Sequence, residues 1–216
     1  MKICMGIGES MRVLVTGIGG QLGHDVMNEL NKRGYEAIGT DIQGNCDVNL
    51  DITDTAAVAD AVCNISPDAL IHCAAWTAVD AAEEEENLEK VTAVNVKGTY
   101  HLAKVCAEMN CKMMYISTDY VFDGQGEVPW EPDCEDYAPV NVYGKTKLEG
   151  ELAVKEFVKK YFIVRIAWVF GKNGNNFIRT MLKVGKTHDR LTVVNDQIGT
   201  PTYTLDLARL LVEMIQ

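Results

Sequence analysis

Tyr143 and Lys147 are the residues of this chain whose types and spacing most directly suggest chemistry. They lie in the segment Asn141-Val-Tyr-Gly-Lys-Thr-Lys147, and the i, i+4 spacing places both side chains on one face of a helix. A phenol has an ordinary pKa of about 10, so it is a poor acid or base near neutral pH. A lysine ammonium one turn away favours the phenolate and suggests acid–base chemistry, although an ordinary exposed helix face would show the same spacing.

A glycine-rich turn, Gly17-Ile-Gly-Gly20-Gln-Leu-Gly23, comes after an apolar segment and opens an expected helix. Glycine permits the tight turn and the close approach of a ligand to the backbone, and the first amides of a helix bind phosphate groups. The strand–turn–helix setting therefore predicts a dinucleotide site. Asp41, at the end of the second expected strand, is placed to accept hydrogen bonds from the adenosine ribose.

The residues after Asp41 indicate which dinucleotide is preferred. No arginine comes closely after this aspartate, so the 2'-phosphate of NADPH has no evident partner and NADH is favoured. The alternative that Asp41 only caps a turn stays open.

A polar triplet, Ser117-Thr118-Asp119, comes after another apolar segment. Neighbouring side chains of a strand point to opposite faces, so Ser117 and Thr118 are not expected to serve one site easily. Taken with the glycine turn and the Tyr143–Lys147 pair, the triplet suggests hydride chemistry on a carbonyl group.

The elements that would position these residues alternate along the chain. The expected strands are short and apolar or β-branched: Arg12–Thr16, Tyr35–Thr40, Ala69–Cys73, Lys112–Ser117 and Tyr161–Ala167. The expected helices are Gly20–Lys32, Thr55–Asn64 with Asp54 as N-cap, Asn87–Met109, Val142–Lys160 and Leu205–Ile215.

Strands alternating with helices predict an α/β fold: a doubly wound, Rossmann-type parallel sheet with helices on both faces. In such sheets ligands bind at the carboxyl ends of the strands. The residues at or just beyond these ends are Gly17, Asp41, Ala75, Thr118 and Trp168. We expect a disordered extension at residues 1–10, a cofactor domain at 11–170, and a partial substrate-binding region with returning Rossmann elements at 171–216.

Composition excludes several classes of protein. The 216 residues are 47% hydrophobic and 24% charged, which is typical of a globular protein. The net charge of −11 argues against nucleic acid or an anionic membrane surface as partner. Seven scattered cysteines without a Cys-x-x-Cys pair indicate a reduced, cytoplasmic protein, and the four dispersed histidines form no metal-ligand pattern. The acidic run Glu83–Glu86 is interpreted as a solvated helix end, with a metal site as the lesser alternative.

Several motifs together resemble the extended short-chain dehydrogenase/reductases and, within them, the dTDP-4-dehydrorhamnose reductase family. The segments that carry the resemblance are the glycine turn, Ala74-Ala-Trp-Thr-Ala-Val-Asp80, Ser117-Thr-Asp-Tyr-Val-Phe-Asp123, Tyr143-x-x-x-Lys147, Trp168-Val-Phe-Gly171, Gly174-Asn-Asn-Phe177 and Asp196-Gln-x-Gly-x-Pro201-Thr202. The resemblance covers about residues 11–216. It implies reduction of the C4 ketone of dTDP-4-dehydro-L-rhamnose to dTDP-L-rhamnose by NAD(P)H, within nucleotide-sugar and cell-surface polysaccharide synthesis.

The resemblance also implies a set of site residues. Tyr143 would protonate the ketone oxygen, Lys147 would hold the nicotinamide ribose and lower the pKa of Tyr143, and Thr118 would hydrogen-bond the same carbonyl. The residues implied to bind the cofactor, besides Tyr143 and Lys147, are Gly17, Gly20, Gln21, Leu22, Asp41, Asp51, Ile52, Ala75, Trp76, Thr77 and Asn95. The residues implied to bind the substrate are Thr118, Asp119, Trp168, Asn176, Phe177 and Gln197.

Two of these assignments have alternatives that stay open. Trp168 could instead be a core aromatic at the end of a strand, and Asn95 could be a surface residue. Similar reductases use an asparagine like Asn95 to hold a structural water near the lysine. The resemblance allows a monomer or a homodimer, the latter with Mg²⁺ at its interface, and assigns no metal to the site itself.

Other functions remain possible within and outside enzymes. Nucleotide-sugar epimerases and other reductases share the fold. A 4,6-dehydratase would need a glutamate at the position that Tyr120 occupies, directly after Asp119. The regulatory β subunit of methionine adenosyltransferase resembles the same family without acting principally as an enzyme. Family members usually continue past residue 216, which implies a truncated substrate lobe and leaves the competence of the short chain open.

Overall fold

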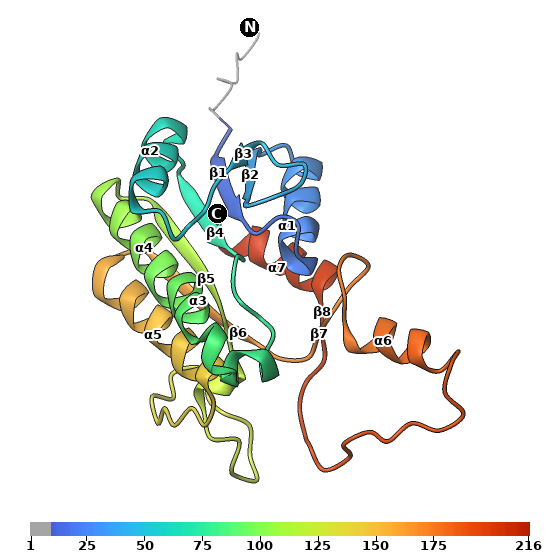
Figure 1. The fold of residues 1–216 in the computed structure, drawn as a ribbon. Helices are drawn as coiled ribbons and strands as arrows, with labels where there is room; N and C mark the ends of the chain where they lie inside the picture. The colour runs from blue at the N-terminus through green and yellow to red at the C-terminus, as the bar shows by residue number, and fades with distance from the viewer. Residues whose placement is uncertain (1–9) are drawn as a thin grey trace, which may run out of the picture.

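The computed structural model describes residues 10–216 and contains a six-stranded parallel sheet in the order β3-β2-β1-β4-β5-β6 (Figure 1). The strands are β1 (Arg12–Thr16), β2 (Glu36–Asp41), β3 (Val48–Asn49), β4 (Ala69–His72), β5 (Lys112–Thr118) and β6 (Tyr161–Ile166). The doubly wound prediction is confirmed. The short strand β3 was not predicted, because two residues carry too little periodicity to be recognised.

The helices cover both faces of this sheet. They are α1 (Gln21–Lys32) and α7 (Thr204–Met214) on one face, and α2 (Thr55–Ile65), α4 (Thr99–Glu108) and α5 (Val142–Phe157) on the other. Two further helices are α3 (Leu88–Thr92), which comes before α4 in the chain, and α6 (Phe177–Val184), which does not cover the sheet. A second sheet of two residues per strand pairs β7 (Val169–Phe170) with β8 (Thr202–Tyr203).

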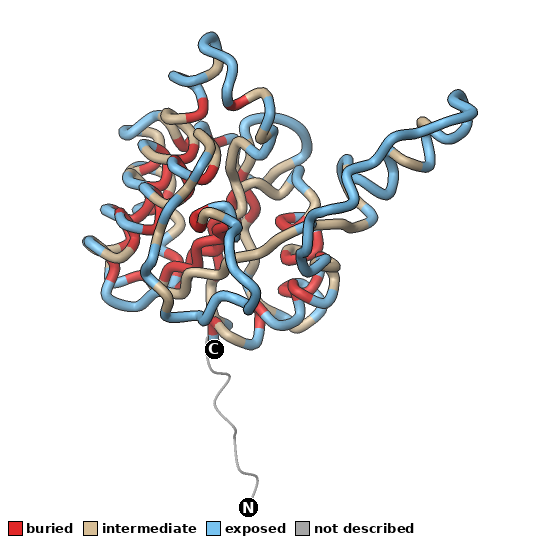
Figure 2. The backbone as a smooth tube through the Cα atoms, turned by 90° about the horizontal axis from the view of Figure 1, so that it is seen from below, coloured by how far each residue is buried: buried red, intermediate tan, exposed pale blue. Residues whose placement is uncertain are grey.

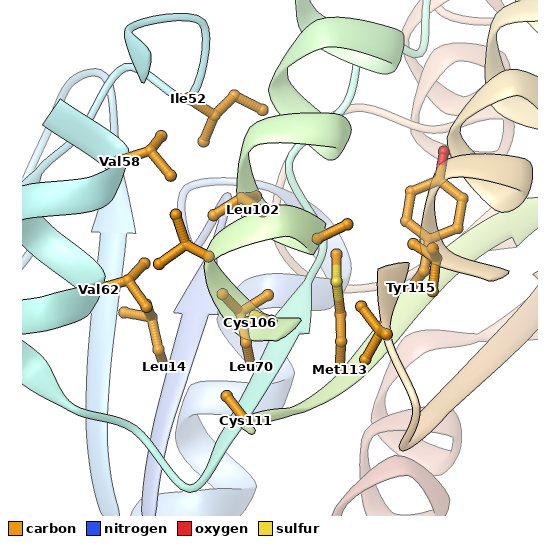
Figure 3. Packing of buried hydrophobic residues seen from close by; sticks show 14 of the residues in the cluster. Leu14, Ile52, Val58, Val62, Leu70, Leu102, Cys106, Cys111, Met113 and Tyr115 are labelled. Atoms are coloured by element: carbon orange, nitrogen blue, oxygen red, sulfur yellow. The ribbon is translucent and has the colours of Figure 1, made fainter. Parts of the chain in front are cut away.

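Side-chain alternation along the strands creates two hydrophobic cores. Leu14 of β1 faces α2, α4 and α5, and the core on this side is drawn in Figure 3. Its neighbours Val13 and Val15 face α1 and α7 on the other side of the sheet. All three side chains are fully buried, and each burial is worth about 1.5–3 kcal/mol relative to exposure. The packing fixes the register of the strands and hence the positions of their carboxyl ends.

Polar caps fix where the helices begin. The Asp54 carboxylate accepts hydrogen bonds from the amides of Ala56 and Ala57, which confirms it as the N-cap of α2. Asn141 caps α5 by accepting from the Gly144 amide at 2.7 Å. Glu83 adds a second cap there, because its Oε1 accepts from the Val142 amide at 2.6 Å. The Glu83 side chain therefore caps α5 from the 3-10 turn Asp80–Glu83, and the interpretation of its acidic run as a solvated end holds only in part.

The long helix expected at Asn87–Met109 is divided by a π-helical segment, Ala93–Gly98, that separates α3 from α4. Gly98 lies against the Ile52 side chain, where a Cβ would come within 2.7 Å of it. Asn95 lies within this segment and its side chain is buried. Such an insertion depends on tertiary packing, and the hydrophobic period of the segment contains no sign of it.

Residues 171–200 differ from the rest of the described chain. None of them is buried, and this segment, which includes α6, projects from the body of the molecule (Figures 1 and 2). The predicted extension at residues 1–10 lies outside the described residues, apart from Ser10, whose hydroxyl donates to the Gly34 carbonyl at 2.8 Å. Within residues 10–216 no helix is both long and apolar enough to cross a bilayer.

Candidate active site

A cavity of ≈ 1110 Å³ opens at the carboxyl ends of the strands. Nearly all the residues predicted to form the site line it: Gly17, Gly20, Gln21, Leu22, Asp41, Asp51, Ile52, Ala75, Trp76, Thr77, Thr118, Asp119, Tyr143, Lys147, Trp168 and Asn176. Ligand cavities commonly measure about 300–1,000 Å³, so this one has room for a large ligand or two adjacent ones.

The glycine turn is shaped for close approach. Gly17 has φ +73, and a Cβ there would lie 2.6 Å from the Ala74 nitrogen, so any larger residue would push β1 and β4 apart. Gly20 is the N-cap of α1 and offers no side-chain cap. The first amides of α1 consequently remain available to a ligand, and an anionic group such as a pyrophosphate fits this position.

Asp41 lies beside the glycine turn. Its Oδ2 accepts from the Gly19 amide at 2.9 Å and its Oδ1 from the Ile42 amide at 2.8 Å. The carboxylate therefore supports the turn while lining the cavity. The two interpretations of Asp41 are compatible, because each carboxylate oxygen can accept more than one hydrogen bond.

Asn95 does not line the cavity and is not on the surface, since its side chain is 1% exposed. Its Oδ1 accepts from the Trp76 amide at 2.8 Å, and its Nδ2 donates to the Trp76 carbonyl and to Thr146 Oγ1. The amide is used within the protein, where it fixes the segment around Trp76, and its assignment to the cofactor site stays a prediction. The surface alternative is wrong, because the side chain is buried.

Tyr143 and Thr118 come together at the cavity. Burial raises the pKa of Tyr143 to about 12, and a hydrogen bond with Thr118 partly offsets the effect. Thr118 Oγ1 lies 3.1 Å from Asp119 Oδ1, to which it donates. Tyr143 is therefore a neutral phenol at pH 7, able to donate a proton to a nearby oxygen.

Lys147 is 2% exposed, and its Nζ donates to the Ile116 carbonyl at 2.7 Å. The same nitrogen lies 4.1 Å from the centroid of the Tyr115 ring. Burial lowers the pKa of Lys147 to about 7, opposed by the charge of Glu151. The expectation that Lys147 lowers the pKa of Tyr143 is not met in this arrangement, because the ammonium turns toward Ile116 and desolvation dominates at the phenol.

Trp168 has φ +46 and is 48% exposed, so it is not a core residue. A positive φ is rare for a bulky residue and holds its ring at the cavity wall. Asn176 also lines the cavity, and its Nδ2 donates to Gln21 Oε1 at 2.9 Å. Phe177 and Gln197 do not line it: Phe177 lies on α6 and is 62% exposed, and Gln197 is exposed in the segment before β8.

The structure adds two residues to the predicted set, Ser117 at the cavity and Asn173 beside the glycine turn. Ser117 is among the residues that line the cavity together with Thr118, but its hydroxyl oxygen is buried and has no hydrogen-bond partner among the described residues. The choice of Thr118 over Ser117 therefore stays a prediction. Asn173 donates to the carbonyls of Gly19 and Gly20 at 3.1 and 3.0 Å and ties residues 171–176 to the glycine turn. The run Asn173-Gly-Asn-Asn176 was a signal for such a turn, because asparagine and glycine favour turns and hydrogen-bond nearby backbone.

The family profile described as the RmlD substrate binding domain matches residues 11–216 of this chain. The chain belongs to the RmlD family. This RmlD-family protein is 39% identical to the spore coat polysaccharide biosynthesis protein SpsK of Bacillus subtilis, over 94% of its own length and 69% of the relative's.

Two solved structures extend the similarity of this RmlD-family protein to three dimensions. A dTDP-4-dehydrorhamnose reductase of Clostridium acetobutylicum has a TM-score of 0.88 and 44% identity, covering 95% of this chain and 70% of that one. A dTDP-4-dehydrorhamnose reductase of Bacillus anthracis in complex with NADP has a TM-score of 0.85 and 41% identity, with the same coverage of 95% and 70%. The chain spans 61–69% of the length of the curated relatives it matches.

Proposed function

We propose that this protein reduces the C4 ketone of dTDP-4-dehydro-L-rhamnose to dTDP-L-rhamnose, in nucleotide-sugar and polysaccharide synthesis. The observation that carries the proposal is the convergence of Tyr143, Thr118 and the glycine turn on one cavity in a member of the RmlD family. The choice of substrate follows the relatives that are named dTDP-4-dehydrorhamnose reductase.

The cavity fits a nicotinamide dinucleotide. The amides at the start of α1 would hold the pyrophosphate, Asp41 the adenosine ribose, and Asp51 with Ile52 the adenine. Ala75, Trp76 and Thr77 would border the nicotinamide. A bound nicotinamide cofactor supplies the hydride. The absence of an arginine close after Asp41 favours NADH, whereas the Bacillus anthracis relative is described with NADP.

The residues of the chain provide the proton and the positioning. Tyr143, a neutral phenol with its pKa raised to about 12, donates its proton to the ketone oxygen as negative charge develops there. Thr118 directs this hydroxyl and hydrogen-bonds the same oxygen. Lys147 would hold the nicotinamide ribose beside Tyr143. Asp119, Trp168 and Asn176 border the sugar nucleotide.

The nature of residue 120 favours reduction over dehydration. Tyr120 comes directly after Asp119 and sets its ring edge-on against Tyr143, with 5.8 Å between the ring centroids. The position therefore holds an aromatic residue where elimination of water would need a second carboxylate. A homodimer and Mg²⁺ at its interface stay predictions of the family resemblance. A cytoplasmic location stays a prediction from the scattered cysteines.

The test is NADH oxidation with dTDP-4-dehydro-L-rhamnose, comparing wild type with Tyr143→Phe. Loss of general acid catalysis is expected to lower kcat by about 100- to 10,000-fold. NADH binding, followed by its fluorescence, should persist in the variant. Tyr161→Phe, at the half-exposed start of β6, is the matched control and should leave kcat unchanged. Equal activity of wild type and Tyr143→Phe would rule out the assigned proton donor, and the absence of any turnover by wild type would rule out the proposed reaction.

A further inference from the structure

A chain of buried hydrogen bonds runs beneath the cavity and is centred on His72, the last residue of β4. The polar side chains of this chain are each at most 5% exposed: Thr16, His72, Thr99, Asn95 and Thr146. They come from β1, β4, α4, the π-helical segment and α5. The reaction proposed above gives His72 no chemical step, but both of its ring nitrogens are hydrogen-bonded, and a fully satisfied buried network of this kind holds the segments that it joins in one arrangement.

The direction of each bond is set by its donors and acceptors. Thr99 donates to the Asn95 carbonyl at 2.7 Å, because a carbonyl can only accept. Thr99 Oγ1 is therefore left to accept, and its contact of 3.1 Å with His72 Nε2 places a proton on that nitrogen. The neutral ring then accepts at Nδ1, which lies 2.7 Å from Thr16 Oγ1. Thr16 in turn accepts from the Ala74 amide at 3.2 Å.

The two ends of the chain reach different parts of the candidate site. The Thr16 end holds Ala74, against which Gly17 packs so closely that no Cβ would fit. The Thr99 end holds the backbone of Asn95, whose side chain fixes Trp76 and donates to Thr146 at 3.1 Å. Thr146 donates to the Tyr143 carbonyl at 2.9 Å and so joins the chain to α5.

The His72 ring also supports the lysine. It packs against Tyr115 with ring centroids 5.6 Å apart. The Tyr115 hydroxyl donates to the Lys147 carbonyl at 3.3 Å, and the Lys147 ammonium lies over the same ring. His72 is therefore linked to Lys147 through Tyr115. It is also linked to Ala74, at the floor of the cavity, through Thr16.

We propose that His72 is a positioning residue, held as the neutral Nε2–H tautomer, that aligns the cofactor-binding turn through Thr16 and the catalytic helix through Thr99. The inference rests on the function proposed above, since it assigns the two ends to cofactor binding and to proton donation. The buried environment agrees with a neutral ring, because desolvation lowers the pKa of His72 to about 3, with the charge of Lys147 acting in the same direction.

The first test is the state of the ring in the wild-type protein. Nitrogen chemical shifts of His72 in the uniformly labelled protein should show Nε2 protonated and Nδ1 unprotonated, without change between pH 5 and pH 8. The exposed ring of His24 supplies the reference signal in the same spectrum. A protonated Nδ1, or a His72 ring that titrates in this range, would overturn the proposal without any mutation and independently of whether the protein is a reductase.

The second test separates the two ends by amide replacements. In His72→Asn the amide oxygen takes the place of Nδ1, so the Thr16 bond is kept and the Thr99 bond is lost. In His72→Gln the amide nitrogen takes the place of Nε2, so the Thr99 bond is kept and the Thr16 bond is lost. We expect His72→Asn to lower kcat by about 10-fold at nearly unchanged NADH affinity, and His72→Gln to weaken NADH binding by about 10-fold with a smaller loss of kcat.

A purely structural role would give a different pattern. Equal losses of kcat and NADH affinity in both variants, in proportion to their melting temperatures, would contradict positioning. Thr99→Val is the matched control for the Thr99 end and should reproduce the kinetic pattern of His72→Asn. If wild type binds NADH but turns over no substrate, the proposed reaction fails, while the tautomer and the affinity difference between the two variants still decide the role of His72.

Discussion

The cavity is built from two regions that differ in how firmly they are held. On one side lie the carboxyl ends of β1, β4 and β5, whose side chains are almost entirely buried. On the other side lie residues 171–200, among which no residue is buried although Gly174, Asn175 and Asn176 line the same cavity. The comparison indicates that a rigid sheet edge serves the proposed cofactor and reacting groups, while a lightly held segment serves the proposed substrate.

The attachment between the two regions is limited and polar. The Asn173 side chain donates a hydrogen bond to the Gly19 carbonyl of the glycine turn. The Asn176 side chain donates one to the side chain of Gln21, the first residue of α1. Net hydrogen bonds of this kind are worth about 0.5–1.5 kcal/mol each, far less than the burial of a sheet core. The segment can therefore change its conformation without unfolding the sheet.

Truncating leucines in the two regions should give the largest contrast. Leu70 of β4 is fully buried, and Leu70→Ala should lower the free energy of unfolding by about 2–5 kcal/mol. Leu182 of α6 is 66% exposed, and Leu182→Ala should change it by less than about 0.5 kcal/mol. Urea unfolding followed by circular dichroism measures both. A comparable loss in the two variants would show that residues 171–200 are packed in solution.

Two glycines with positive φ sharpen the contrast at the turn. A Cβ on Gly17 would meet Ala74, whereas one on Gly44, with φ +86, would meet nothing within 4 Å. Gly17→Ala should weaken NADH binding by about 100-fold or more, because the strain of the left-handed backbone is joined by displacement of the cavity floor. Gly44→Ala carries the backbone strain alone and should leave NADH affinity within about 2-fold. Titration of each variant with NADH, followed by NADH fluorescence, measures both affinities. Similar affinities in the two variants would contradict the role of Gly17 in the close approach to Ala74.

The buried charge of Lys147 gives the stability of the rigid region a dependence on pH. Its folded pKa of about 7 lies below the ordinary lysine value of 10.5, so between these pH values the unfolded chain binds more protons. The contribution of Lys147 to the free energy of unfolding therefore rises with pH from about 7 upward, and its full penalty is present below that. Lys147→Met should remove this rise. Lys145→Met, on the exposed side of α5, should keep it, and parallel pH profiles for both variants would exclude Lys147 as the cause.

Protease cleavage should give the smallest effect on the fold. We expect the first cuts within the exposed residues 185–200, with the sheet remaining folded afterwards. Mass spectrometry of the fragments and circular dichroism of the cut protein check this. First cuts within β4 or α5 would contradict the division into a rigid and a lightly held region.

Sequence reasoning succeeded where a signal is local. The five strands of the predicted sheet come from short apolar runs, and Gly17 and Tyr143 lie in patterns that span one turn or one strand. These features were placed within about three residues of their observed bounds, because side-chain period and turn chemistry act over a few positions.

The rest depends on contacts between distant parts of the chain. Asn173 and Gly19 are 154 residues apart in sequence, and no local pattern relates them. Asn95 is buried within a π-helical segment that has no local sequence signal, and Lys147 contacts the Ile116 carbonyl and the Tyr115 ring, both about 30 residues away in sequence. Trp168 was open to two interpretations because its positive φ is set by the chain path between β6 and β7.

The position of helix α7 near the end of the described chain determines when the core beneath α1 can form during translation. The helix packs on α1, and Leu207, Leu211 and Ile215 finish the core on that face of the sheet. Until residues 204–214 have left the ribosome, α1 and the strands beneath it present an uncovered apolar surface. While residues 171–203 are synthesised, the apolar face of α1 and of the strands beneath it therefore stays exposed to solvent. Chaperones would bind the nascent chain during this interval.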